Sequence, residues 1–129
     1  MNAENFFKEM FYNIWQSHDI SRLDDFYAKD FQEIIAMTDD DHKPFEVSMN
    51  YAYMVEQAQL HKDNYKDTTL DIKKAVATAD NHIAVNFYSS AVNRETGILR
   101  YRYVCGIWRL NHENKIDRVW AVVTPYCPG

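Results

Sequence analysis

The chain has 129 residues, of which 47% are hydrophobic and 26% are charged, and its net charge is −5. This composition is typical of a globular domain and argues against a disordered chain, and the length suffices to bury a core without disulfides or a structural metal. The negative charge and the scattered basic residues argue against binding to nucleic acid or to an anionic membrane, because both need a basic surface. We therefore expect a single domain over residues 1–129.

The compartment is indicated by what the sequence lacks. The first residues have neither the basic flank nor the apolar run of a signal peptide, and no stretch approaches the roughly 20 apolar residues that span a bilayer. The two cysteines, Cys105 and Cys127, form no CxxC pair and no disulfide framework. These features favour the reducing cytoplasm, and no motif points to a cofactor.

Two helices are predicted near the start of the chain. Residues 4–17 carry a wide apolar stripe at helical spacing, formed by Phe6, Phe7, Met10, Phe11, Ile14 and Trp15. The stripe is interpreted as a core anchor, with the wall of an apolar pocket as the alternative. Ser21 and Asp24 have the spacing of a capping motif, which predicts a short second helix from Ser21 to about Ala28.

A strand and a third helix are predicted next. Over residues 31–37 the side chains of Phe31, Glu33, Ile35 and Met37 would share one face of a strand. The acidic turn over residues 38–44 lacks the glycine and distal glutamate of a calcium loop, so no metal site is expected. Helical spacing of apolar residues then predicts a helix over residues 45–61.

From Asp67 onwards the pattern changes to that of strands. Four antiparallel strands are predicted, the last two within residues 97–124 and joined by a turn over residues 111–115. Residues 104–108 and 119–123 are apolar without interruption, which is typical of strands covered on both faces. The predicted fold is α+β, with three helices on one face of a mostly antiparallel sheet and a second copy of the chain on the other.

Two phrases, HDISRLDDFYAKDFQEI over residues 18–34 and IWRLNHENKIDRVWAVV over residues 107–123, carry a resemblance. Together with the order of elements, they resemble the nuclear transport factor 2-like superfamily, and within it the SnoaL-like branch. The resemblance implies a curved sheet wrapped around the first helix as a cone with a central pocket. It also implies frequent dimerisation through the outer face of the sheet.

The superfamily contains ketosteroid isomerases, cyclases and dehydratases as well as binding proteins, so the fold alone does not select a function. In the ketosteroid isomerases, the resemblance places an Asp base at the position of Ile35. It places an oxyanion-binding Tyr at Phe11 and a protonated Asp at Gly106. All three groups are absent here, which argues against ketosteroid isomerase activity.

The lining of the pocket follows from strand alternation, because Glu33 shares a face with Ile35 and Arg102 shares one with Gly106. The expected lining is Phe11, Trp15, Tyr27, Ile35, Tyr51, Val55, Arg102, Gly106, Trp108, Val119, Ala121 and Val123. Burial would raise the pKa of Glu33 and suit it to acid–base work, whereas an ion pair with Arg100 or Arg102 would lower it. We favour the ion pair. His18, His61 and His112 fall at element ends, where solvated or capping roles are expected.

Two functions are compatible with these observations. The first is a dimeric module that binds a small apolar or aromatic ligand, or a partner, without chemistry. The alternative is a lyase, isomerase or cyclase-like enzyme acting on a small carbonyl compound, with Glu33 as the acid/base and Tyr27, Tyr51 or Arg102 orienting the substrate. Alternation also predicts the residues of a homodimer interface on the outer face, namely Tyr101, Tyr103, Cys105, Ile107, Trp120 and Val122.

Overall fold

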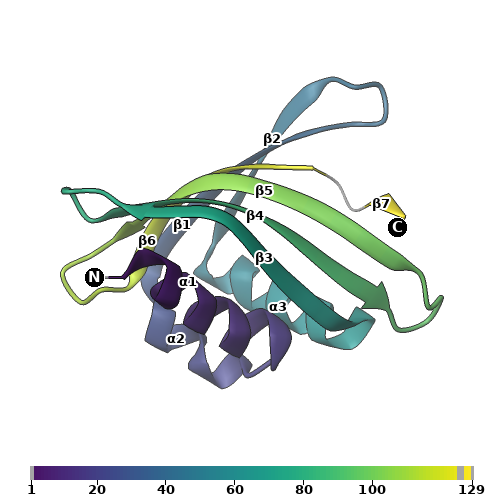
Figure 1. Cartoon of the computed structure of the whole chain (residues 1–129), viewed down its shortest axis with the longest axis horizontal. Helices are drawn as coiled ribbons and strands as arrows, with labels where there is room; N and C mark the ends of the chain where they lie inside the picture. Colours follow the sequence, from purple (N-terminus) through teal and green to yellow (C-terminus); the bar gives the residue numbers. More distant parts are fainter. Residues whose placement is uncertain (1, 125–126, 129) are drawn as a thin grey trace.

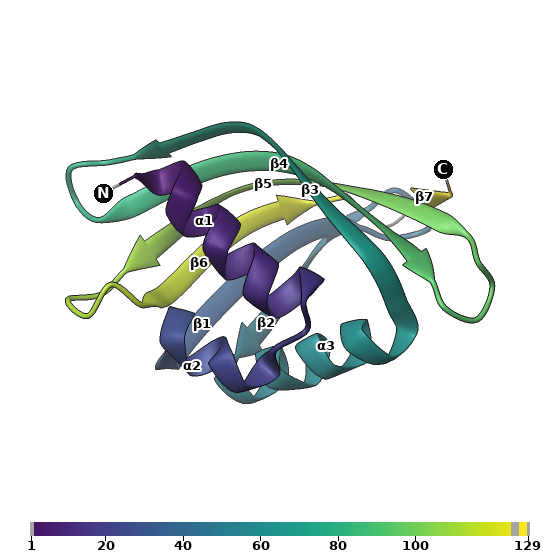
Figure 2. The ribbon, with the colours of Figure 1, turned by 60° about the horizontal axis from the view of Figure 1, so that its bottom comes forward.

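A strongly curved sheet wraps around the helices in the computed structural model, which describes residues 2–124 and the backbone of residues 127–128 (Figures 1 and 2). The helical elements are α1 (Ala3–Phe11), a π-helical turn (Tyr12–Gln16), a 3₁₀ turn (Ile20–Arg22), α2 (Leu23–Phe26) and α3 (Tyr51–Asn64). The strands are β1 (Tyr27–Thr38), β2 (Pro44–Asn50), β3 (Tyr65–Ala77), β4 (His82–Asn93), β5 (Leu99–Leu110), β6 (Ile116–Val123) and β7 (Cys127–Pro128). The α+β class predicted from the sequence is confirmed.

The sheet has the strand order β2-β1-β6-β5-β4-β3, with β7 pairing with β5. Every pair along this path is antiparallel except β1 with β6, which is parallel. The parallel pair places Glu33 beside Val119 and Ile35 beside Ala121. The first and last long strands of the chain therefore lie together in the middle of the sheet.

The two faces of the sheet differ along β5 and β6. Val104, Trp108 and Val119 are buried on the concave face, whereas Ile107 and Val122 on the convex face are exposed. Because side chains alternate along a strand, this division matches the prediction from parity. The helices cover only the concave face (Figure 2).

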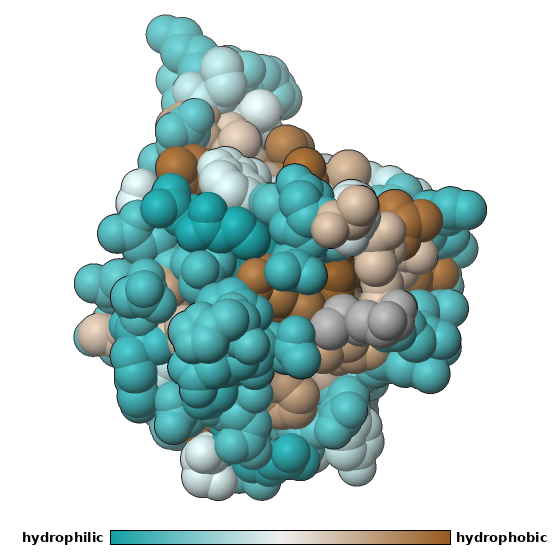
Figure 3. Space-filling view, turned by 90° about the vertical axis from the view of Figure 1, so that its left-hand side faces the viewer, coloured by the Kyte–Doolittle hydropathy of each residue, from teal (hydrophilic) through white to brown (hydrophobic). Residues whose placement is uncertain are grey.

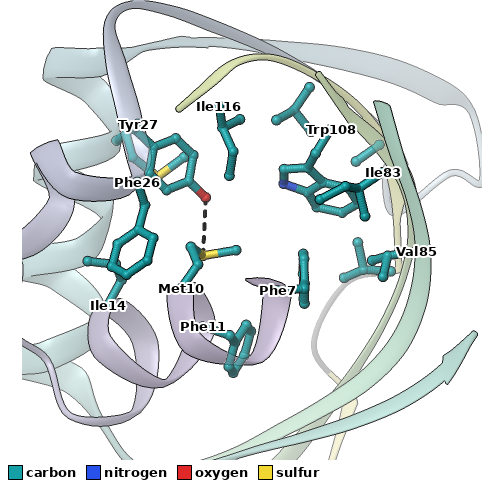
Figure 4. Close-up of a cluster of buried hydrophobic side chains, with 14 of the residues drawn as sticks. Phe7, Met10, Phe11, Ile14, Phe26, Tyr27, Ile83, Val85, Trp108 and Ile116 are labelled. Atoms are coloured by element: carbon teal, nitrogen blue, oxygen red, sulfur yellow. Dashed lines mark hydrogen bonds between the residues drawn. The ribbon is translucent and has the colours of Figure 1, made fainter. Parts of the chain in front are cut away.

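The core lies between α1 and the concave face. The ring of Phe7 contacts the rings of Phe87 and Trp108, with centroids 5.1 Å away in each case. Met10 lies next to it and Ile14 lies beside Phe26, and both are fully buried (Figure 4). Truncating a buried aromatic side chain such as Phe7 to alanine removes about 3–5 kcal/mol of stability. The aromatic stripe thus anchors the helix to the sheet.

The helical region over residues 3–26 differs in detail from the prediction. The first helix changes to a π-helical turn after Phe11, closed by the bond from the Ser17 amide to the Tyr12 carbonyl at 2.7 Å. The predicted cap at Ser21 is wrong, because its hydroxyl donates to the Asp19 carboxylate and α2 begins at Leu23 without a side-chain cap. The α2 helix is consequently only one turn long.

The predicted helix over residues 45–61 is wrong at its beginning, where the chain forms strand β2. This strand pairs with β1, with Val47 beside Ile35. Asn50 then caps α3, since its side-chain oxygen accepts a hydrogen bond from the Tyr53 amide at 2.9 Å. Phe45, Val47 and Met49 alternate with polar residues, and this period of two was the signal for a strand.

The structure also bears on the absence of membrane-spanning helices and on the position of Cys105. Within the described residues, no helix is long and apolar enough to cross a bilayer. Cys105 is exposed on the convex face as a free thiol, as strand alternation predicts. The side chain of Cys127 lies outside the described part of the chain.

Candidate functional site

A cavity of about 500 Å³ lies between the concave face of the sheet, α1 and α3. Apolar side chains from all three regions form most of its wall, including Phe7 from α1, Met54 from α3 and Phe87 from β4. This size and lining are typical of pockets for small molecules. Polar side chains also line it, and they decide what chemistry the cavity can perform.

Most of the residues that the sequence places at the pocket line this cavity. They are Phe11, Trp15, Tyr27, Glu33, Ile35, Arg102, Trp108, Ala121 and Val123. Tyr51, Val55 and Val119 do not line it. Val119 is completely buried in the core, and the Tyr51 ring instead lies under the ammonium group of Lys29, 4.4 Å from it. Tyr51 and Val55 lie on α3 and are partly exposed outside the cavity.

Gly106 also does not line the cavity, although its row on the sheet does. A Cβ atom at this position would lie 3.0 Å from the ring of Trp108, 3.0 Å from the Cβ of Ala121 and 2.7 Å from the Trp120 carbonyl. The indole of Trp108 therefore fills the space above the glycine. The absent side chain makes room for Trp108 and not for a ligand.

Glu33 projects from β1 into the cavity and is only 8% exposed. Within residues 2–124, no hydrogen-bond donor reaches its carboxylate and no cation lies within 4.0 Å of it. Burial raises its pKa to about 7, and the charge of Arg102 only partly offsets this. The expected ion pair is therefore not formed, and near neutral pH the group exchanges readily between its acid and its base form.

Tyr27 lies on the same strand, at the inner end of the cavity. Its hydroxyl is buried and donates to the sulfur of Met10 at 3.6 Å (Figure 4). Burial and then the charge of Glu33 raise its pKa, so the phenol stays protonated. Because a thioether is a weak acceptor, this donor can turn to a stronger acceptor in the cavity at little cost.

A second polar group lies on the opposite wall and was not predicted. The Nε2 atom of His61 on α3 is 2.7 Å from the Oγ1 atom of Thr68 on β3, and both residues line the cavity. Burial, followed by the charges of His18 and Arg102, lowers the pKa of His61 to about 4. The solvated or capping role expected for His61 is wrong, since the ring is a neutral hydrogen-bonding group inside the cavity.

The sequence contains no local signal for the His61–Thr68 pair. The two residues come together because α3 ends at Asn64 and β3 begins at Tyr65, which places Thr68 next to the last turn of the helix. A further bond from the Gln16 amide to the Thr68 carbonyl, at 3.0 Å, ties this corner to the π-helical turn. The pair depends on the packing of three elements, which periodicity does not reveal.

Arg102 connects the two walls electrostatically. It lies on β5 beside the buried Ser89 of β4, and its charge acts on both Glu33 and His61. A cation at this position favours the ionised form of Glu33 and disfavours protonation of His61. It is therefore placed to stabilise negative charge that develops inside the cavity.

The fold was compared with known proteins. No family model and no curated protein matches the sequence. The structure is similar to that of IdmH, a proposed polyketide cyclase from Streptomyces antibioticus, with 16% identity, a TM-score of 0.69 and coverage of 95% of this chain and 92% of that chain. It is also similar to a proposed isomerase from Rhodopseudomonas palustris, with 10% identity, a TM-score of 0.73 and coverage of 95% and 90%.

A third similar structure is SalBIII, an epoxide hydrolase/cyclase-like enzyme of pyran ring formation in salinomycin. Its identity is 14%, its TM-score is 0.65, and the match covers 94% of this chain and 89% of that chain. At these identities the matches show a shared fold and not a shared activity. The chain shares the curved α+β fold of these structures, which is the fold that the sequence resemblance implies.

Proposed function

We propose that the protein is an enzyme that moves a proton on a small, mostly apolar carbonyl compound, in an isomerisation or cyclisation, with Glu33 as the acid/base. The observation that carries this proposal is the carboxylate of Glu33, which lies unpaired among the described residues inside an apolar cavity and has a pKa near 7. Proton transfer is most efficient when the pKa of the catalytic group lies near the working pH. A purely structural carboxylate is normally paired and has a low pKa.

The step begins when the Glu33 carboxylate takes a proton from the carbon next to the carbonyl. The C–H bond breaks, its electron pair moves toward the carbonyl oxygen, and an enolate forms. Arg102 supplies a positive charge near this enolate, and the protonated hydroxyl of Tyr27 supplies a donor for its oxygen. In an isomerisation Glu33 then returns the proton to another carbon. In a cyclisation the enolate carbon attacks a second carbonyl of the same molecule, a C–C bond forms, and Glu33 returns the proton to the resulting alkoxide.

The similar structures favour the enzyme over a binding module that performs no chemistry. Their names are those of cyclases, an isomerase and an epoxide hydrolase/cyclase-like enzyme. The absent groups at Phe11, Ile35 and Gly106 argue against the machinery of the ketosteroid isomerases. Glu33 lies two residues before Ile35 on the same face of β1, so a base can reach the cavity from a neighbouring position.

The test is hydrogen–deuterium exchange at the carbon next to the carbonyl of 2-tetralone, an apolar bicyclic ketone, followed by proton NMR in D₂O. We expect the protein to accelerate exchange and Glu33→Gln to slow it by about a hundredfold or more. Glu56→Gln is the matched control, because Glu56 is exposed on α3 and loses the same charge. Wild-type exchange no faster than that of Glu33→Gln would contradict the proposal.

We further propose that two copies pair through the convex face of the sheet. Val122 is 62% exposed there and Tyr101 46%, which is unusual for apolar side chains gathered on one face of a monomer. Apolar residues lie at the foot of the projecting hydrophilic β1–β2 hairpin (Figure 3). A shallow convex groove is bordered by Glu46 on β2 and Lys74 on β3. A two-fold axis parallel to the strands would bring Glu46 of one copy toward Lys74 of the other, because β2 and β3 lie at opposite edges of the sheet.

Analytical ultracentrifugation tests the dimer. We expect twice the monomer mass at micromolar concentration, and we expect Trp120→Glu to give the monomer, because a charge would be buried at the centre of the interface. Glu113→Gln, in the exposed turn between β5 and β6, is a control that should leave the mass unchanged. A wild-type protein that stays monomeric at high micromolar concentration would contradict the pairing.

A further inference from the structure

Two sets of polar side chains in the cavity lie on different elements, and Tyr53, Gln57, Asn64, Tyr65, Ser89 and Arg102 also line it. Tyr27 and Glu33 belong to β1, whereas His61 and Thr68 belong to α3 and β3. In the sheet, β1 and β3 are separated by β6, β5 and β4. Four spacings of about 4.8 Å separate the two strands by roughly 19 Å across the sheet, and the sheet curves between them (Figure 2).

Apolar side chains occupy most of the space between the two sets. Phe11, Phe87 and Val104 line the cavity there, and Arg102 projects from β5 between the walls. The action of its charge on both Glu33 and His61 agrees with this central position. A molecule that reaches from Glu33 to Thr68 passes mostly apolar side chains, with Ser89 and Arg102 as polar groups on the strands between, and so suits a mostly apolar body with a polar group at each end.

The hydroxyl of Thr68 retains capacity for a ligand. Thr68 is 8% exposed, and among the described residues its hydroxyl is bonded to His61 Nε2. A hydroxyl has one donor and two acceptor positions, so one bond to the imidazole leaves others available. Burying polar groups in an apolar wall is unfavourable unless they are bonded, and a ligand hydroxyl at this wall would complete the bonding.

We propose that the substrate carries a hydroxyl group at the end remote from its reacting carbonyl, and that Thr68, held in place by His61, binds this hydroxyl. The inference rests on the proposed function, since it assumes that the carbonyl end lies at Glu33. The substrate class is then a hydroxylated, apolar cyclic or bicyclic ketone.

Three ketones that differ only at the remote end test the inference. They are 2-tetralone, 6-methyl-2-tetralone as a control for size, and 6-hydroxy-2-tetralone, and the exchange assay gives KM for each. One added hydrogen bond at a buried site should lower KM of the hydroxy ketone about fivefold below that of the methyl ketone. Thr68→Val, which replaces the hydroxyl by a methyl group of similar shape, should reduce this ratio to about one.

Two further variants separate the role of the hydroxyl from a general disturbance. Thr68→Ser retains the hydroxyl and should retain the preference. Thr69→Val removes the neighbouring hydroxyl, which is exposed and bonded to Ser90 at 2.6 Å, and should also retain the preference. Circular dichroism of each variant confirms that it is folded before its ratio is used.

The outcomes distinguish this inference from the proposed function. If the wild-type protein exchanges all three ketones without a preference, or if the preference survives in Thr68→Val, the hydroxyl site is wrong and the role of Glu33 stands. If no ketone is exchanged, the proposed function is contradicted. In that case NMR titration gives the dissociation constant of each of the three ketones. Equal dissociation constants for the methyl and hydroxy compounds would overturn the hydroxyl site as well.

Discussion

Glu33 and His61 lie on different walls of the cavity, and burial changes their pKa values in opposite directions. Burial is the largest influence on both Glu33 and His61, and in each case it favours the uncharged form. For the acid this raises the pKa to about 7, whereas for the base it lowers the pKa to about 4. Glu33 is thereby left able to exchange a proton at neutral pH, and His61 is left as a fixed, neutral hydrogen-bonding group.

The largest expected effect concerns the pH dependence of exchange. The base form of Glu33 is the reactive one, so kcat/KM for 2-tetralone should rise tenfold per pH unit below about pH 7 and level off above it. Glu33→Gln should lower the plateau by about a hundredfold and remove this rise. A profile in which activity instead rises through pH 4 would assign the titration to His61 and reverse the roles of the two walls.

The second prediction concerns the free energy of unfolding of Glu33→Gln relative to that of the wild type. The pKa of Glu33 is raised from its usual 4.5 to about 7 in the folded protein, so its contribution to stability is full below pH 4.5 and is lost as the pH rises to 7. The loss amounts to at most about 3 kcal/mol. Urea unfolding above pH 7 should therefore find Glu33→Gln more stable than the wild type, and a less stable variant would contradict the unpaired carboxylate.

His61 should act in the opposite direction. Its pKa is lowered from 6.5 to about 4 in the folded protein, so its contribution is full above pH 6.5 and is lost as the pH falls to 4, by at most about 3 kcal/mol. Between pH 4.5 and 6.5 the two slopes offset each other in the wild type. In this window we expect stability to rise with pH in Glu33→Gln and to fall with pH in His61→Gln, as measured by urea unfolding.

The smallest expected effect is that of Arg102→Gln on the pKa values of both Glu33 and His61. The charge of Arg102 lowers the pKa of Glu33 and that of His61, so Arg102→Gln should raise both by a fraction of a pH unit. The pKa of Glu33 would move further from its usual value, while that of His61 would move back toward it. Carbon NMR of Glu33 and proton NMR of the His61 ring measure the two shifts, and an unchanged pair would place Arg102 outside the electrostatics of the cavity.

Strand alternation made much of this site predictable. It assigned Glu33 and Arg102 to the concave face, and Ile107 and Val122 to the convex face, because parity along a strand is a local property of the chain. The predicted helix began at residue 45, because the alternation over residues 45–50 is short and was taken for part of the helix. The role of Asn50 as the cap of α3 was missed for the same reason. Pairing of this segment with β1 is what makes it a strand.

Side-chain shape and contacts between distant elements were not predictable in the same way. The sequence shows a small residue at Gly106, but not that the ring of Trp108 covers it. It shows a histidine near the end of a helix, but not that Thr68 of the next strand meets it. The ionisation of Glu33 depended on whether a guanidinium reached it, and that distance is set by the curvature of the whole sheet.

The parallel pairing of β1 with β6 has a consequence for how the protein is made. Residues 32–36 bond to residues 118–122, so the strand that carries Glu33 acquires its inner neighbour only when the last long strand has been synthesised. Contacts so far apart in sequence form slowly, because the intervening chain must first be ordered. During translation the cone cannot close until residues 116–123 have left the ribosome, and the apolar stripe of α1 stays uncovered by β6 until then.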